Sequence, residues 1–212
     1  MRTRFAMIAT LLASTPLHGQ LPDTSYAGRV LSALARKLDA DATLPESFRR
    51  LTPPDLARTM DTGHFDLLLD DPSLNLYVRT MAATLHQVPD SVCGAMLLEA
   101  HGQTHGAVML GYVDSMTAAN WGTVFERVIR ARATSATGGR VGSTEEVQAA
   151  MLGIFGALSE TDRARLMAIS THPPPTAPDM CWAARMIADG IAGLPSEQLA
   201  PVSRAMSAGS PN

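Results

Sequence analysis

Residues 117–129, TAANWGTVFERVI, decide the fold class, because their apolar side chains recur at the spacing of an α-helix. The apolar positions are Trp121, Val124, Phe125, Val128 and Ile129. Intervals of three and four residues place these side chains on one face of a helix, whereas a half-buried strand alternates at every second residue. The stretch therefore predicts an amphipathic helix that begins at about Thr117 and buries one face in a core.

Helix-start signals accompany this spacing along most of the chain. The clearest is Thr52-Pro53-Pro54-Asp55, a capping box with proline at the first helical position. We expect helices to begin at or near Tyr26, Thr52, Asp71, Asp90, Thr117, Ser143, Ser159, Asp179 and Ser196. The helix from Asp90 is expected to continue to about Met116. Because no run alternates at period two for long, the predicted fold class is all-α, a compact bundle of about seven to nine helices.

Three segments interrupt the helical pattern. Residues 134–143, TSATGGRVGS, predict a mobile loop that divides the helices into two groups. Residues 172–178, HPPPTAP, predict an extended connector, because proline restricts itself and the residue before it. Residues 209–212 predict a disordered tail. With residues 1–20 set aside, residues 21–208 are long enough for a single helical domain with its own core.

The first 20 residues have the layout of a secretory signal peptide. Arg2 and Arg4 give a positive start, and the nine residues 5–13, FAMIATLLA, follow as an apolar run. This run is shorter than the ~20 residues that a membrane-spanning helix needs. A cytosolic chain with an apolar N-terminal helix is the alternative. We expect the mature chain to be soluble and exported, either periplasmic or secreted, with no membrane span after signal cleavage.

The two cysteines stand in matching contexts. Cys93 follows Pro-Asp-Ser-Val, and Cys181 follows Pro-Asp-Met, so each comes shortly after a Pro-Asp helix start. In an exported chain this arrangement predicts one disulfide between Cys93 and Cys181. The alternative is a reactive thiol at a helix N-terminus, but the Cys-x-x-Cys pair of redox proteins is missing. Two cysteines are also too few for a zinc site.

Composition argues against nucleic-acid binding. The chain has 17 Lys and Arg against 20 Asp and Glu, and two of the arginines, Arg2 and Arg4, lie in the predicted signal peptide, which leaves a formal charge of −5. Nucleic-acid binding needs clustered cations that neutralise phosphates, and no basic cluster stands out. An acidic chain instead suits a basic protein partner, because complementary charge guides encounter.

A histidine-containing segment, LEAHGQTHG at residues 98–106, is the most chemically suggestive cluster. His101 and His105 are four residues apart and would share one helix face. The candidate polar groove that they define consists of Glu99, His101, His105 and Tyr112. We predict no metal site there, because a third ligand is lacking and Gly102 occupies the place of the glutamate in His-Glu-x-x-His.

Other catalytic motifs are missing from the sequence. No Gly-x-Ser-x-Gly elbow is present, and residues 138–142, GGRVG, lack the lysine of a phosphate-binding loop. The acidic pairs Asp70-Asp71 and Glu145-Glu146 stand at helix N-termini, where the helix dipole favours negative charge. The sequence therefore predicts no catalytic residue and no cofactor.

Residues 179–185, DMCWAAR, followed by residues 194–198, LPSEQ, resemble the C-terminal part of small exported helical proteins of proteobacteria. Those proteins pair a mid-chain cysteine with a Cys-Trp-Ala motif near the end. The resemblance implies an all-helical periplasmic fold with one disulfide, and it implies no established activity.

These observations lead to three hypotheses about function. The leading one is a non-enzymatic periplasmic protein that binds a protein partner, in its specific version an immunity or inhibitor protein against a secreted effector. The second is a cell-wall hydrolase or another enzyme that uses Glu99, His101 and His105. The third is a carrier of small apolar ligands, with a methionine-rich interior that opens into a pocket.

Overall fold

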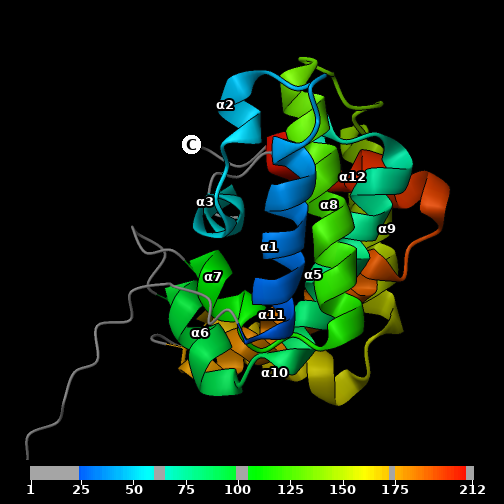
Figure 1. Ribbon diagram of the computed structural model, residues 1–212. Coiled ribbons are helices and arrows are strands. Elements are labelled where there is room, and N and C mark those ends of the chain that lie inside the picture. The colour runs from blue at the N-terminus through cyan, green and yellow to red at the C-terminus, as the bar shows by residue number, and fades with distance from the viewer. Residues whose placement is uncertain (1–23, 60–64, 99–104, 172–174, 209–212) are drawn as a thin grey trace, which may run out of the picture.

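A computed structural model describes residues 24–59, 65–98, 105–171 and 175–208 of the chain. Within these ranges every regular element is an α-helix, so the all-α prediction is confirmed (Figure 1). The helices are α1 (Tyr26–Asp39), α2 (Glu46–Arg49), α3 (Pro53–Arg58), α4 (Phe65–Leu68), α5 (Asp71–Gln87), α6 (Asp90–Leu98), α7 (His105–Leu110), α8 (Ser115–Ala133), α9 (Thr144–Ala157), α10 (Glu160–Thr171), α11 (Ala177–Ala192) and α12 (Ser196–Ala208). Eight of these twelve have nine or more residues, in agreement with the expected bundle of about seven to nine helices.

The helix α8 packs against both α1 and α5, and it lies beside α1 in Figure 1. The apolar face predicted from residues 117–129 is buried: Trp121 is 1% exposed and Phe125 is fully buried. The indole Nε1 of Trp121 donates a hydrogen bond to Thr84 Oγ1 of α5 at 2.8 Å. Because the polar edge of the indole also has a partner, the largest core side chain is held in one orientation.

Polar side chains define the helix starts, and they correct several expected boundaries. Thr52 forms the capping box that the sequence predicts, and Ser143, expected only to begin a helix, forms a second one. The start of α8 was expected at Thr117, but the helix begins at Ser115, because Asp114 accepts the backbone N–H of Thr117 at 2.7 Å. Similarly, Asp70 rather than Asp71 precedes α5 as its cap.

The long helix expected from Asp90 to about Met116 is wrong. The described residues of this stretch form α6 up to Leu98 and α7 up to Leu110. A turn follows α7, and Met116 already belongs to α8. Residues 99–104 lie outside the described part of the chain. The predicted connector at residues 172–178 is also shorter than expected, because Thr176 caps α11 and Pro178 lies in its first turn.

The segment 134–143, predicted as a mobile loop, runs between α8 and α9, and its backbone forms hydrogen bonds to α4 and α12. The N–H of Gly138 donates to the Leu67 carbonyl, and the N–H of Gly142 donates to the Pro201 carbonyl, each at 2.8 Å. The carbonyl of Arg140 accepts from a buried arginine of α12 at 3.0 Å. These contacts attach the loop to α4 and α12; its mobility stays a prediction.

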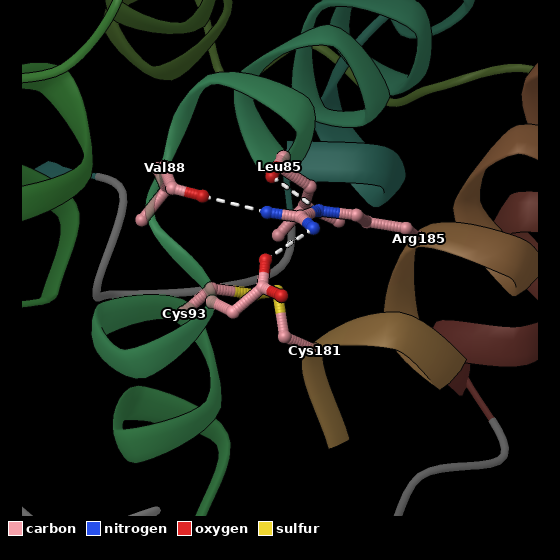
Figure 2. The surroundings of a disulfide bond; sticks show 6 residues. Leu85, Val88, Cys93, Cys181 and Arg185 are labelled. Atoms are coloured by element: carbon pink, nitrogen blue, oxygen red, sulfur yellow. Dashed lines mark hydrogen bonds and ion pairs between the residues drawn. A yellow bond between two sulfur atoms is a disulfide. The ribbon is translucent and has the colours of Figure 1, made fainter. Parts of the chain in front are cut away.

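The predicted disulfide is confirmed. Cys93 and Cys181 are bonded, with their Cα atoms 5.4 Å apart, and they link α6 to α11. Figure 2 shows Arg185 beside the bridge, reaching from α11 to the end of α5. Its Nε donates to the Leu85 carbonyl at 2.8 Å and its Nη2 to the Val88 carbonyl at 2.6 Å. The bridge and the arginine therefore fix α11 against two consecutive helices. Cys181 lies two residues farther into its helix than expected, because α11 begins at Ala177 rather than at Asp179.

Gly94 is the point of closest approach between α6 and α11, and we expect alanine to be rejected there. A Cβ at position 94 would lie 1.7 Å from the carbonyl oxygen of Ala177, which is backbone and cannot rotate away. We expect Gly94→Ala to lower the free energy of unfolding by about 1–3 kcal/mol through overpacking. Equilibrium unfolding in urea measures the change.

Gly153 of α9 supplies the matched control, because a Cβ there would meet nothing within 4 Å. Gly153→Ala is expected to raise the free energy of unfolding by roughly 0.5–1 kcal/mol, since alanine loses less backbone entropy in a helix than glycine. Equal stabilities for the two variants would show that α6 and α11 do not pack this closely.

Candidate functional site

The sequence-predicted polar groove falls largely outside what the structure describes. Glu99 and His101 belong to residues 99–104, which lie outside the described ranges, and His105 opens α7 with a side chain that is likewise outside them. Tyr112 lies in the turn after α7 with 45% of its surface exposed. The grouping of these four residues therefore stays a prediction.

A different feature, which the sequence analysis missed, is an apolar groove beside α9. We call it the α9 groove; it has a volume of about 630 Å³ and is bordered by α9, α11 and α12. Small residues form both sides, with Ala149, Gly153 and Ala157 on α9 facing Gly190 and Gly193 at the end of α11. Successive α9 positions four residues apart lie on one face of the helix, so these small residues form the α9 side of the groove, which we call its floor. Longer side chains, among them Ile154 and Met186, also line the groove.

The helix α9 is exposed to an unusual degree for its apolar sequence. Residues 149–158, AAMLGIFGAL, contain no charge, yet only Ala150 and Ile154 of α9 are buried. Ile154 attaches the helix to α11, where its side chain lies against Gly190. Leu152 is 73% exposed and Phe155 is 39% exposed, but neither lines the groove. Helix geometry places both on the face of α9 that is turned away from it.

The uncharged run 149–158 was the signal that sequence reasoning could have used. An amphipathic surface helix carries polar residues on its outer face, and α9 has none in this run. A helix that is apolar all round is expected to be covered on all sides, but in the structure its neighbours α11 and α12 lie on one side only.

The charged residues that line the α9 groove are both acidic. Glu146 stands at the N-terminal end of α9, and Asp189 stands across from it on α11. Hydrogen bonds from the guanidinium of Arg140 and from the Ser143 N–H hold the pKa of Glu146 below its ordinary value. Asp189 contacts Nε2 of His86 at 2.8 Å.

Both carboxylates remain accessible to a further partner. The side chains of Glu146 and Asp189 are 44% and 47% exposed. Each carboxylate has about four lone-pair positions, so the two donors at Glu146 and the one at Asp189 leave others open. The groove thus combines an apolar floor with two points that attract positive charge.

The described residues show neither a metal-ion site nor a membrane-spanning helix. Among them, no group of three or more His, Cys, Asp or Glu side chains is placed to hold a metal ion. None of the described helices is both long and apolar enough to cross a bilayer. Comparison with known protein families, with curated proteins and with solved structures finds no match for this chain.

Proposed function

We propose that this protein is an exported, non-enzymatic binding protein that receives a helix of a partner protein in the α9 groove. The observation that carries the proposal is the stripe of small residues Ala149, Gly153 and Ala157, which is open to solvent along an apolar groove. An amphipathic helix laid into an apolar groove is a common mode of recognition. From Glu146 to Leu158 the groove follows α9 for about 18 Å, which matches about three turns of a bound helix.

The groove favours a partner helix with a small apolar face and basic residues near its ends. Glu146 and Asp189 line the groove, and no Lys or Arg does. A Lys or Arg of the partner would form a charge-assisted hydrogen bond with either carboxylate, whereas an acidic partner would be repelled. The overall formal charge of −3 acts in the same direction.

The export of the protein belongs to the same proposal. A buried disulfide is typical of oxidising compartments, which supports a periplasmic or secreted location together with the signal-like N-terminus. An immunity or inhibitor protein that binds a secreted effector is the specific version we propose, because such a protein needs a rigid binding surface and no catalytic group.

The enzyme alternative depends on Glu99, His101 and His105, whose side chains lie outside the described part of the structure. The described residues therefore give no support to the enzyme alternative. Alanine replacement of His101 and His105 remains its direct test, with loss of a measured cell-wall hydrolysis as the supporting result.

A larger side chain at Gly153 is expected to fill the groove and to weaken the binding of a helical peptide. The probes are two fluorescent peptides of about 14 residues, each Ala- and Leu-rich and helical, one with Arg at both ends and one with Glu at the same positions. We expect the Arg peptide to bind at least about tenfold more tightly than the Glu peptide, because charged pairs at this exposure are worth roughly 1 kcal/mol each. Fluorescence anisotropy measures both affinities.

The matched variants are Gly153→Leu and Gly156→Leu. Both glycines lie on α9 with nothing within 4 Å of an added Cβ, but only Gly153 lines the groove. We expect Gly153→Leu to weaken Arg-peptide binding at least about tenfold by occupying the floor, and Gly156→Leu to change it little. Equal binding by the two variants, or equal binding of the two peptides, contradicts the proposal.

A further inference from the structure

A small apolar pocket lies beside the disulfide, where the end of α5 meets α6 and α7. We call it the α6 pocket; its volume is about 200 Å³. Figure 2 draws three of its lining residues, Leu85, Val88 and Cys93, in the surroundings of the bridge. The described lining residues are Leu85, Val88, Cys93, Met96, Leu97 and Met109. None of them lines the α9 groove, so the two sites are independent.

The α6 pocket belongs to a second hydrophobic cluster, separate from the core around Trp121. The buried members of this cluster are Val88, Cys93, Met109 and Cys181. Val88 is 1% exposed and Cys93 is 2% exposed, whereas Leu97 is 38% exposed. Leu97 is therefore the lining side chain through which a molecule from solvent would reach the pocket.

The lining of the α6 pocket suits an apolar occupant better than water. Its described side chains carry no hydroxyl, amide or charged group. A buried water needs two to four polar partners, and an apolar cavity of about 150 Å³ stays dry and accepts benzene. The α6 pocket is slightly larger than that, so a single ring with one small substituent matches it in size.

Sulfur atoms give the α6 pocket a preference among apolar molecules. Met96 and Met109 contribute thioethers to the lining, and Cys93 contributes a sulfur of the disulfide. Sulfur is polarisable and makes favourable contacts with aromatic rings, often at the ring edge. Methionine side chains are also unbranched and adjust to the shape of a neighbouring group. These lining groups therefore suit a flat aromatic ring.

We propose that the α6 pocket binds a small aromatic hydrocarbon, a single ring without a polar substituent. The ring restores the dispersion contacts that side chains around an empty space lack. A hydroxyl on the same ring would give up its hydrogen bonds to water and find no side-chain partner among the described lining residues. This assignment does not depend on helix binding in the α9 groove.

Toluene and phenol test the assignment, because they have similar size and differ in a methyl group against a hydroxyl. Binding to the full-length, disulfide-bonded protein is measured by ligand-observed NMR titration up to about 5 mM, a range suited to fragment-sized ligands. We expect saturable binding of toluene and at least about tenfold weaker binding of phenol, since a buried hydroxyl without a partner loses affinity. No saturable binding of toluene, or equal affinity for both compounds, overturns the proposal.

Two matched variants, Val88→Phe and Val92→Phe, locate the binding. Both valines belong to the same hydrophobic cluster, but only Val88 lines the α6 pocket. We expect Val88→Phe to weaken toluene binding at least about tenfold by filling the pocket, and Val92→Phe to change it by no more than about twofold. An equal loss in both variants overturns the proposal.

Leu97→Trp is the second pocket-filling variant, in case Val88→Phe fails to fold by circular dichroism. Leu97 lines the pocket but is partly exposed, so a larger side chain at this position is accommodated more easily than at a buried one. We expect the same weakening of toluene binding, at least about tenfold. Unchanged toluene binding in a folded pocket-filling variant overturns the proposal, and this result is independent of peptide binding in the α9 groove.

Discussion

Replacing Arg204 by leucine is expected to lower the free energy of unfolding by about 3–5 kcal/mol, the range found when one partner of a buried charged network is removed. Arg204 is 1% exposed and is one of the largest buried side chains of the described residues. Its Nε donates to the Asp66 carbonyl at 2.9 Å, and its Nη2 donates to the Leu69 carbonyl at 2.7 Å. Its Nη1 reaches the Arg140 carbonyl at 3.0 Å and Asp71 at 2.7 Å.

The size of this effect follows from the number of segments that meet at one side chain. The guanidinium of Arg204 satisfies carbonyls from α4, from the turn that follows α4 and from the loop between α8 and α9. Leucine fills similar space but donates nothing, so the buried carbonyls lose their partners at about 1–3 kcal/mol each, offset in part by relaxation. The last helix would keep its hydrogen bonds at Pro201 and Ser196, but it would lose all four polar contacts of Arg204.

Arg79→Leu is the matched control for this experiment. Arg79 also lies at the contact between α5 and α12, but it is exposed, and its contact with α12 is one hydrogen bond to Ser196 at 3.3 Å. We expect its replacement to change the free energy of unfolding by no more than about 0.5 kcal/mol. Urea denaturation followed by circular dichroism measures both variants. Similar losses for Arg79→Leu and Arg204→Leu would show that the buried network does not stabilise the protein.

The core helices were predictable from sequence because their burial follows a local period. Trp121 and Phe125 are four residues apart, and the helix geometry alone places both on the buried face of α8. The disulfide was predictable for a similar reason, since Cys93 and Cys181 follow the same Pro-Asp signal in a chain that begins like an export signal.

The boundaries were harder to predict because neighbouring polar residues compete for the same cap. Asp114 and Thr117 are both good N-cap residues by type. In the structure, Asp114 follows the turn after α7 and accepts the N–H of Thr117. Arg204 is a clearer example of a feature that local sequence does not predict. In sequence it is a polar residue near the end of a helix, and its burial depends on carbonyls more than 60 residues away.

The uncharged run 149–158 points to an unusual surface at α9, but the position of the α9 groove does not follow from the sequence. Ala149, Gly153 and Ala157 indicate a thin helix, and thin helices usually pack closely against a neighbour. Only the fold shows that the described helices leave this stripe open between α9 and the end of α11. The predicted polar groove at Glu99, His101, His105 and Tyr112 and the observed groove are therefore separate candidates, of which the structure describes the second.

Removing the disulfide is expected to lower the free energy of unfolding by about 4.5 kcal/mol, the chain-entropy value for a closed loop of this length. Cys93 and Cys181 are separated by 88 residues, so the bridge removes many conformations from the unfolded chain. The variant is Cys93→Ala/Cys181→Ala, measured by urea denaturation against the oxidised wild type. The denatured wild type should show no titratable thiol, and two thiols would mean that the bridge is not formed.

The native structure should survive this loss, because the bridge is not the only link at its site. Arg185 still donates to the carbonyls of Leu85 and Val88, and its ion pair with Asp90 at 2.6 Å ties α11 to the start of α6. We therefore expect the far-ultraviolet circular dichroism of the double variant to match the wild type in the absence of denaturant. A changed native spectrum would mean instead that the bridge holds α6 and α11 together in the folded state, and the stabilisation would then belong to the native contacts rather than to the unfolded chain.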